Sequence, residues 1–220
     1  MRQEKKAQRQ QQIENAAYAV LEAKGYGGTS MLGIARQAKA SNETLYNWYG
    51  DKQGLFQALV TRNAEEVKSH LESELESDND ALSILGTLGP KLLKLLTGDR
   101  SVALNRAAAA DSTGELGATL SKAGREAVFP LLEQVLKRAK NEGQLHFDHA
   151  GEAVGLYLDL LIGDQQIRRV IGRLPAPTGA ALDDRAARAV AHLRTLLSDA
   201  PTPGENRTPR QETGKPRHEL

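Results

Sequence analysis

The sequence predicts an all-α protein in which three short N-terminal helices precede a larger helical domain. Its apolar residues are mostly Leu and Ala, which favour helices over strands. They recur at intervals of three and four residues, and no convincing stretch alternates with a period of two. Gly and Pro divide the chain into segments of helical length. We therefore expect helices throughout and no sheet.

Length and composition limit the class of protein further. A chain of 220 residues can form one large domain or two modest ones. No segment approaches the roughly 20 apolar residues that cross a bilayer. The N-terminus is basic and polar and lacks the apolar core of a secretory signal. The chain has no Cys, which excludes disulfides, thiolate metal sites and Cys nucleophiles. We expect a cytoplasmic protein without membrane contact.

The charges of the chain are unevenly distributed. Residues 1–62 hold nine Lys and Arg against five acidic residues, whereas residues 63–200 hold sixteen against twenty. A basic head on an acidic body indicates that the head meets a polyanion, although a difference of this size can also arise by chance.

The N-terminal segments read as three helices. The first carries one apolar stripe, and Gly25 ends it in a left-handed cap. Ser30 caps the second, whose inward face is Met31, Ile34, Ala35 and Ala38. After a tight turn, Ser41 caps the third helix, "NETLYNWY". A long helix follows from Lys52 into the seventies.

The remaining segments also read as helices. Residues 80–96 are apolar nearly all round, and we expect Gly86, Gly89 and Pro90 to bend or divide this helix. The other expected elements are a short helix after residue 101, a Gly-containing link at 111–124, and helices at 125–143, 151–172 and 180–197. Residues 201–220 are polar and rich in Pro, and we expect them to be disordered.

The second and third helices, joined by a short turn, form a helix-turn-helix motif. In that motif the third helix enters the major groove of a DNA duplex. Leu45 and Tyr49 close the small core, which turns the other side chains of the third helix outward or to its flank. Asn47 can read adenine through two hydrogen bonds. Thr44 and Tyr46 can donate to phosphates, or Thr44 can contact a thymine methyl.

Two further groups can bind the DNA backbone. Lys52 supplies a cation at the start of the next helix, and the free N–H groups after Ser41 can bind a phosphate. The alternative for Tyr46 and Trp48 is that both rings pack against the first helix. The alternative for Lys52 is a solvated surface side chain.

One ordered motif runs from residue 29 to residue 60. Its members are Thr29-Ser30-Met31, Ile34-Ala35, Ser41, Thr44-Leu45-Tyr46, Tyr49, Lys52 and Leu55-Phe56. With these residues in this order, the segment resembles the DNA-binding head of TetR/AcrR-type transcriptional regulators. The segment departs from the family pattern in three respects: Lys39-Ala40 replaces the usual Gly-Val in the turn, Gly33 replaces a residue that is commonly charged, and Trp48 occupies a place often held by His. A left-handed Lys39 costs roughly 1–2 kcal/mol.

The resemblance implies about nine helices, a DNA-binding domain at 1–62 with an N-terminal arm at 1–8, and a ligand-binding and dimerisation domain at 63–200. It places DNA contacts on Thr29, Ser30, Asn42, Thr44, Tyr46, Asn47, Trp48 and Lys52, beside Ser41 at the helix start. It also implies a homodimer through 151–172 and 180–197 on a near-palindromic operator.

The resemblance further implies a ligand-responsive repressor. We expect its pocket among residues 86–96, 101–123 and 125–140, where Leu and Ala favour a lipophilic small molecule. Ligand binding would shift the population towards a spacing of the heads that does not fit the operator. His146, Asp148 and His149 could bind a metal ion, but a polar linker is the better interpretation, so we predict neither a metal nor a cofactor.

Two other classes of protein are alternatives. A helical adaptor would use the head to bind a protein partner. An all-helical enzyme is less favoured, because the sequence lacks a nucleophile elbow, a phosphate-binding loop, an HExxH motif and paired carboxylates. We therefore predict no catalytic activity.

Overall fold

A computed structural model describes residues 2–198 of the chain. Within that range it contains eleven α-helices, one π-helical turn and no strand, which confirms the predicted all-α class. The segment 201–220, for which we expected disorder, lies outside the described residues.

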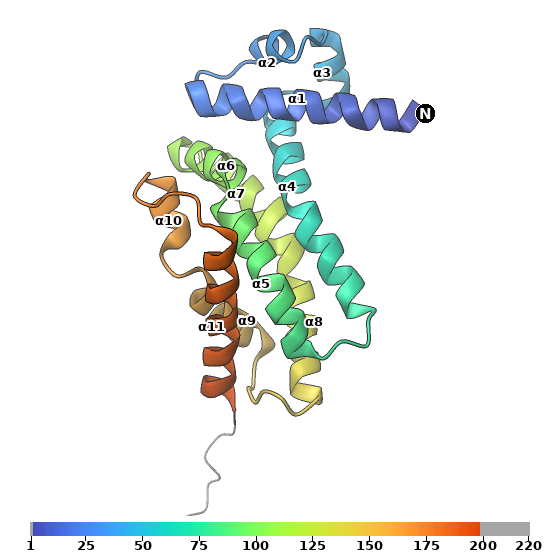
Figure 1. Cartoon of the computed structure of the whole chain (residues 1–220). Helices are drawn as coiled ribbons and strands as arrows, with labels where there is room; N and C mark the ends of the chain where they lie inside the picture. The colour runs from blue at the N-terminus through green and yellow to red at the C-terminus, as the bar shows by residue number, and fades with distance from the viewer. Residues whose placement is uncertain (1, 199–220) are drawn as a thin grey trace, which may run out of the picture.

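The head of the molecule contains three helices and the start of a fourth: α1 (Arg2–Lys24), α2 (Met31–Gln37), α3 (Asn42–Tyr49) and α4 (Lys52–Leu75). Figure 1 shows α1 lying across the end of the body, with α2 and α3 on its far side and α4 leading into the body. Helix α3 has the residues expected of it. Residues 2–8, expected to form an arm, are instead the first turns of α1, because no Gly or Pro interrupts the segment.

The body is a bundle of longer helices with shorter ones at the end that faces the head (Figure 1). Its elements are α5 (Ala81–Thr97), α6 (Asp99–Ala110), α7 (Glu115–Leu120), the π-helical turn η1 (Ser121–Arg125), α8 (Glu126–Asn141), α9 (Ala150–Ile162), α10 (Gln165–Val170) and α11 (Gly179–Leu197).

Three expectations about the body are corrected. Helix α5 is not divided but continuous through Pro90, because it buries apolar side chains on both sides of Pro90, including Leu85, Leu88, Leu92 and Leu93, and this burial opposes a break. The expected link at 111–124 is mostly helical, since it forms α7 and most of η1. The expected helix at 151–172 is two helices, because Gly163 between α9 and α10 adopts a φ of +51° that ends α9.

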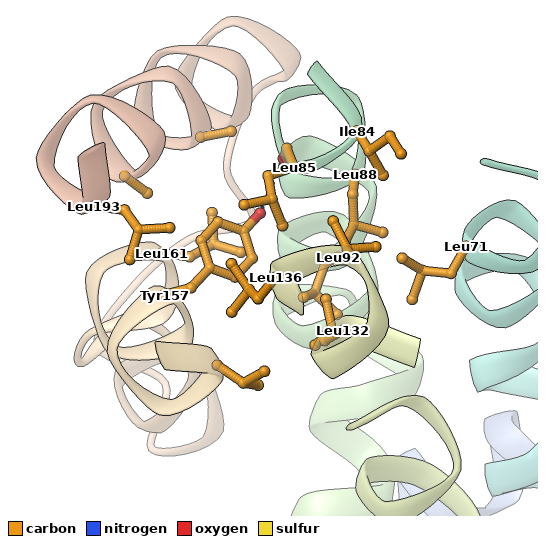
Figure 2. Packing of buried hydrophobic residues seen from close by; sticks show 14 of the residues in the cluster. Leu71, Ile84, Leu85, Leu88, Leu92, Leu132, Leu136, Tyr157, Leu161 and Leu193 are labelled. Carbon is orange, nitrogen blue, oxygen red and sulfur yellow. Dashed lines mark hydrogen bonds between the residues drawn. The ribbon is translucent and has the colours of Figure 1, made fainter. Parts of the chain in front are cut away.

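The core of the body is built mainly from leucines of α4, α5, α8, α9 and α11. Tyr157 lies fully buried among them, and Figure 2 shows its ring beside Leu136 and Leu161. Its hydroxyl donates to the Leu85 carbonyl at 3.0 Å, so α9 is hydrogen-bonded to α5 through an otherwise apolar core. That bond satisfies the one polar atom of the ring, which burial would otherwise penalise.

Helix α4 belongs to both parts of the molecule. Its first turns, up to Val60, pack in the head core, whereas Ala64, Val67 and Leu71 pack in the body core. The boundary expected at residues 62 and 63 therefore falls inside one continuous helix. The head core also includes Leu104 of α6, so the two parts share packed side chains.

Candidate functional site

Helix α3 presents a polar outer face above a single buried anchor. Leu45 is fully buried, while Asn42, Glu43, Tyr46 and Asn47 are exposed. These four residues occur as two pairs four apart, so they lie on one face of the helix. The structure thus brings together three of the predicted contact residues on a surface open to a partner.

The N-terminus of α3 is held by a hydroxyl pair. The Ser41 Oγ accepts from the Thr44 N–H at 3.1 Å, and the two hydroxyl oxygens lie 2.7 Å apart. The hydrogen bond between the two hydroxyls uses one of their two hydrogens, so the other hydrogen remains free to be donated to a phosphate. The predicted roles of both residues are compatible with their positions.

The two residues before α2 differ from each other. Ser30 is exposed and caps α2, since its Oγ accepts from the Gly33 N–H at 3.1 Å. Thr29 is buried, and its hydroxyl donates to the Gly25 carbonyl at 2.7 Å. Because this hydroxyl is enclosed and already bonded, the Thr29 side chain holds the turn after α1 and does not face a DNA partner in this conformation.

Trp48 occupies an intermediate position between the two roles considered for it. Its ring is partly buried and packs against the head core. The ammonium of Lys6, from the first turns of α1, lies 5.9 Å from the centre of the ring. Extension of α1 to Arg2 therefore brings a basic side chain beside α3, which the expectation of an arm at 1–8 did not include.

Lys52 is a partner of Tyr26 in this structure. Its ammonium donates to the Tyr26 carbonyl at 3.1 Å and lies 4.1 Å from the centre of the Tyr26 ring. The side chain is therefore neither a simple solvated Lys nor a cation extended into solvent. An ammonium has three donors, so the group can still donate to a phosphate from this fixed position.

The turn between α2 and α3 contains strained backbone. Lys39 has a φ of +50°, the left-handed region expected from its replacement of the family's usual Gly. The Arg9 guanidinium of α1 donates to the carbonyls of both Ala38 and Lys39. Arg9 thus ties the strained turn to α1, a role that sequence reasoning missed although the basic charge near the N-terminus was visible.

Several polar contacts join the head to the body. Arg100 of α6 donates to Asn15 of α1 at 2.8 Å and stacks 5.1 Å from the centre of the Tyr18 ring. Farther along α4, the Asn63 amide donates to the Ser101 hydroxyl of α6 at 2.8 Å. Helices α1, α4 and α6 are therefore linked by hydrogen bonds as well as by packing.

A buried carboxyl lies at the same junction. Glu14 of α1 is 3% exposed and pairs with Arg62 of α4 at 3.6 Å. Burial raises the pKa of Glu14, and the positive charges of Arg62 and Arg100 oppose that rise.

Tyr49 lies near this carboxyl. Burial and the nearby Glu14 raise the pKa of Tyr49 to about 12. The buried Tyr49 hydroxyl has no hydrogen-bond partner among the described residues.

The body contains a largely apolar cavity of about 340 Å³ between α4 and α8. The three segments expected to form a pocket all contribute to it through α5, α6, α7, η1 and α8. Helices α4, α9 and α10 complete the wall, which the sequence did not indicate. The volume lies within the range of small-molecule pockets, at its lower end.

Polar groups of the cavity wall are few and mostly bonded to one another. Besides the Asn63 bond to Ser101, the Asn105 amide donates to the Ser101 carbonyl at 2.8 Å. The Gln166 amide donates to the Leu96 carbonyl at 3.3 Å. Arg125 of η1 is the lining residue that carries a charge, and its guanidinium lies 5.6 Å from the centre of the Phe129 ring.

Neither a metal centre nor a membrane span emerges from the described residues. Within 2–198, no group of three His, Asp or Glu side chains is arranged to hold a metal ion. None of the helices in that range combines the length and apolar character needed to cross a bilayer.

A capped third helix with an exposed polar face, carried on a three-helix head, defines a protein of the helix-turn-helix class. Residues 13–59 match the family model of bacterial regulatory proteins of the tetR family. Residues 83–194 match the model of the AefR-like transcriptional repressor C-terminal domain. No curated protein matches the sequence.

Solved structures give the same result. A TetR-family regulator from Mesorhizobium loti is 25% identical, with a TM-score of 0.72 over 88% of this chain and 98% of that chain. A TetR regulator from Agrobacterium tumefaciens is 30% identical, with a TM-score of 0.67, and the match covers 86% of this chain and 94% of that chain. FadR from Bacillus subtilis, solved in complex with stearoyl-CoA, is 17% identical, with a TM-score of 0.65. The match covers 84% of this chain and 97% of that chain, and it shows a similar fold alone.

The chain belongs to the TetR family of bacterial transcriptional regulators. It is a DNA-binding regulator of the repressor type and not an enzyme, as the sequence predicted. The family also has a small-molecule-binding C-terminal domain as a typical feature.

Proposed function

We propose that this protein is a ligand-responsive repressor that binds a near-palindromic operator as a homodimer and is released by a lipophilic small molecule. The observation that supports this most directly is the path of α4. The same helix packs in the head core up to Val60 and lines the cavity with Val60, Asn63 and Ala64. A change in the cavity wall is therefore also a change in the support of the head.

In the proposed complex, α3 enters the major groove with its exposed face. Asn47 reads a base edge, while Tyr46 and the hydroxyl pair of Ser41 and Thr44 contact phosphates. Asn42 borders the same face, and Ser30 contacts the backbone from the start of α2. Lys52 binds a phosphate from its fixed position beside Tyr26. Trp48 supports α3 from its flank.

Ligand binding would act through the walls of the cavity. Helix α6 lines the cavity with Ser101 and Leu104 and contacts α1 through Arg100. A ligand that favours another position of α4 or α6 would change the orientation of the head by population shift. The stearoyl-CoA bound to the Bacillus subtilis regulator supports a lipophilic ligand in this fold.

The homodimer would form through α9, α10 and α11, the helices of the segments 151–172 and 180–197. Three of the five exposed large apolar side chains among the described residues, Ile167, Ile171 and Leu196, lie in these two segments, and a dimer interface there would cover them. Two heads on one dimer would reach successive major grooves, which requires half-sites about one helical turn apart.

Selection of bound sequences from random duplexes tests the DNA-binding mode. We expect two related half-sites and an affinity that falls steeply as salt concentration rises, because bound cations release counterions from DNA. A helical adaptor that binds protein would give neither result. Failure to bind any duplex at low salt would refute the proposal.

Asn47→Ala tests base recognition by α3. We expect a loss of preference at one base pair in each half-site, worth about 1–3 kcal/mol per contact. Asn141→Ala, which removes an exposed amide at the end of α8, is the control and should keep the parent's profile. An Asn47 variant with an unchanged profile would remove this residue from the proposed contacts.

Sedimentation equilibrium tests the dimer. We expect the parent to have the mass of two chains, and Leu196→Glu to weaken association because it buries a charge at the interface. Leu32→Glu adds the same charge at an exposed apolar residue of the head and should leave the mass unchanged. Equal effects of the two variants would contradict an interface on α11.

A further inference from the structure

The formal charge of the cavity wall is positive only. Arg125 is the lining residue with a formal charge, and no Asp or Glu lines the cavity in the described part of the chain. A cationic ligand would therefore meet repulsion and no counter-charge. A neutral ligand would leave the charge of the guanidinium unpaired, whereas an anion would gain a charge-assisted hydrogen bond there.

The other polar groups of the wall already have partners. Asn63 donates to Ser101, Asn105 donates to the Ser101 carbonyl, and Gln166 donates to the Leu96 carbonyl. Ser121, which precedes Arg125 by four residues, donates to Glu126 at 2.9 Å. Each of these groups therefore already has a hydrogen-bond partner without a ligand, whereas no ion pair of the Arg125 guanidinium is seen among the described residues.

Arg125 is placed to bind at the mouth of the cavity. Its side chain is exposed and lies over Phe129, a neighbour on the same wall. The residue belongs to the π-helical turn η1, a rare geometry that occurs frequently at functional sites. Lining residues recur from Gly117 to Leu132 at intervals of one and three, so Arg125 lies within one continuous stripe of the wall.

We infer that the effector is a lipophilic anion whose carboxylate pairs with Arg125 at the cavity mouth while its apolar body lies among the leucines. This inference rests on the ligand-responsive function proposed above and names the chemical class of its ligand. A guanidinium matches a carboxylate with two parallel N–H donors, which a hydroxyl or an ammonium cannot use in the same way.

Titration calorimetry with the full chain tests the inference. The probes are decanoate, decan-1-ol and decylamine, which share one alkyl chain and differ in the head group. We expect decanoate to bind at least tenfold more tightly than decan-1-ol and decylamine to bind most weakly. Equal binding of acid and alcohol, preference for the amine, or no binding of decanoate would overturn the inference.

Variants of η1 assign the preference to one residue. Arg125→Gln should lower the affinity for decanoate to that for decan-1-ol and change the alcohol's affinity less than twofold. Arg125→Lys, which keeps the charge, should retain a preference for the acid. Lys122→Gln removes an exposed cation of the same turn outside the cavity wall and should change neither affinity. Equal effects of the Arg125→Gln and Lys122→Gln variants would refute a specific pairing.

Release from DNA separates this inference from the function on which it depends. If decan-1-ol or decylamine releases the protein from its operator and decanoate does not, the ligand response is supported and the assignment of an anion is wrong. If the protein binds no duplex at all, the proposed function fails, while the calorimetry still measures which head group the cavity prefers.

Discussion

The exposed face of α3 in the head and the cavity wall in the body depend on the sequence in different ways. In the head, short helices begin at capping side chains. The orientation of each exposed residue of α3 follows from its spacing in the sequence from the buried Leu45. In the body, the cavity wall takes residues from eight elements spread between Val60 and Gln166. The first arrangement is local in sequence, and the second depends on how distant helices pack.

This difference matters for how the two parts can be changed. A substitution on the outer face of α3 affects a surface that little else touches. A substitution in the body acts on helices that also support the head, because α4 and α6 contribute to the head core. We therefore expect substitutions on the outer face of α3 to change the free energy of unfolding less than substitutions in the body, and stability measurements can test this.

The largest effect on stability that we expect comes from the contact between α5 and α11. A Cβ added at Gly89 would lie 2.6 Å from the Ala186 Cβ and 3.3 Å from the Tyr157 hydroxyl. Gly89→Ala should therefore lower the free energy of unfolding by about 1–3 kcal/mol through overpacking. Urea denaturation followed by circular dichroism measures the change.

Gly86→Ala is the matched control for that experiment. Gly86 lies one turn earlier in α5, and a Cβ there would meet nothing within 4 Å. The alanine should stabilise the helix by up to about 1 kcal/mol, because Gly has the lower helical propensity. Destabilisation by both variants, or by neither, would contradict a close packing contact specific to Gly89.

The same contrast explains what could be predicted from the sequence. Helix α3 was predicted residue by residue, since Ser41 begins it and Gly50 ends it with a φ of +77°. The burial of Thr29 was missed, because the acceptor of its hydroxyl is a backbone carbonyl that carries no sequence signal. The tie between Lys52 and Tyr26 was missed for the same reason.

In the body, helical periodicity indicated the elements but not their partners. Gly86, Gly89 and Pro90 do not divide α5, whereas Gly163 ends α9, which shows that tertiary packing decides whether a Gly or Pro ends a helix. The contribution of α9 and α10 to the cavity depends on the path of the chain after residue 145, which no local pattern specifies.

The left-handed Lys39 lies in the turn between α2 and α3 of the head. Lys39→Gly should raise the free energy of unfolding by about 1–2 kcal/mol, because Gly adopts the φ of +50° without the cost of a Cβ. Lys39→Ala removes the same ammonium and keeps the Cβ, so it should show no such gain. Thermal unfolding of the three proteins measures the difference, and an equal gain in both variants would attribute the effect to charge.

Helix α5 of the body also begins at a capping side chain, as α2 and α3 of the head do. Asp80 caps α5, and its carboxylate accepts from the Ser83 N–H and from the Gln144 amide. Asp80→Ala should destabilise the protein by about 1 kcal/mol, whereas Asp80→Asn keeps a capping oxygen and should cost less. Urea denaturation at neutral pH distinguishes them, and equal losses would argue against a capping role.

The same carboxylate gives a dependence on pH. Hydrogen bonds, first from the Ser83 hydroxyl and then from Gln144, lower the pKa of Asp80 from 3.8 to about 2. Because the folded pKa is the lower one, its stabilising contribution is complete above 3.8 and is lost as the pH falls towards 2. The stability difference between the parent and Asp80→Asn should shrink over that range.

The smallest expected effect lies where the two parts meet, at Glu14. Burial raises the pKa of this carboxyl above 4.5, despite the opposing charges of Arg62 and Arg100. The folded state therefore binds the proton more tightly than the unfolded state, so ionisation of Glu14 lowers stability as the pH rises above 4.5. Glu14→Gln removes this loss, and its stability relative to the parent should increase with pH.

Urea denaturation of the parent and the variant across mildly acidic to neutral pH measures that trend. Glu22→Gln removes an exposed carboxylate from the same helix and controls for the loss of one negative charge. If the relative stability of Glu14→Gln instead decreases as pH rises, the ion pair with Arg62 outweighs the cost of burial. The junction of head and body would then be stabilised by charge, and α4 would connect the two parts through its salt bridge as well as its packing.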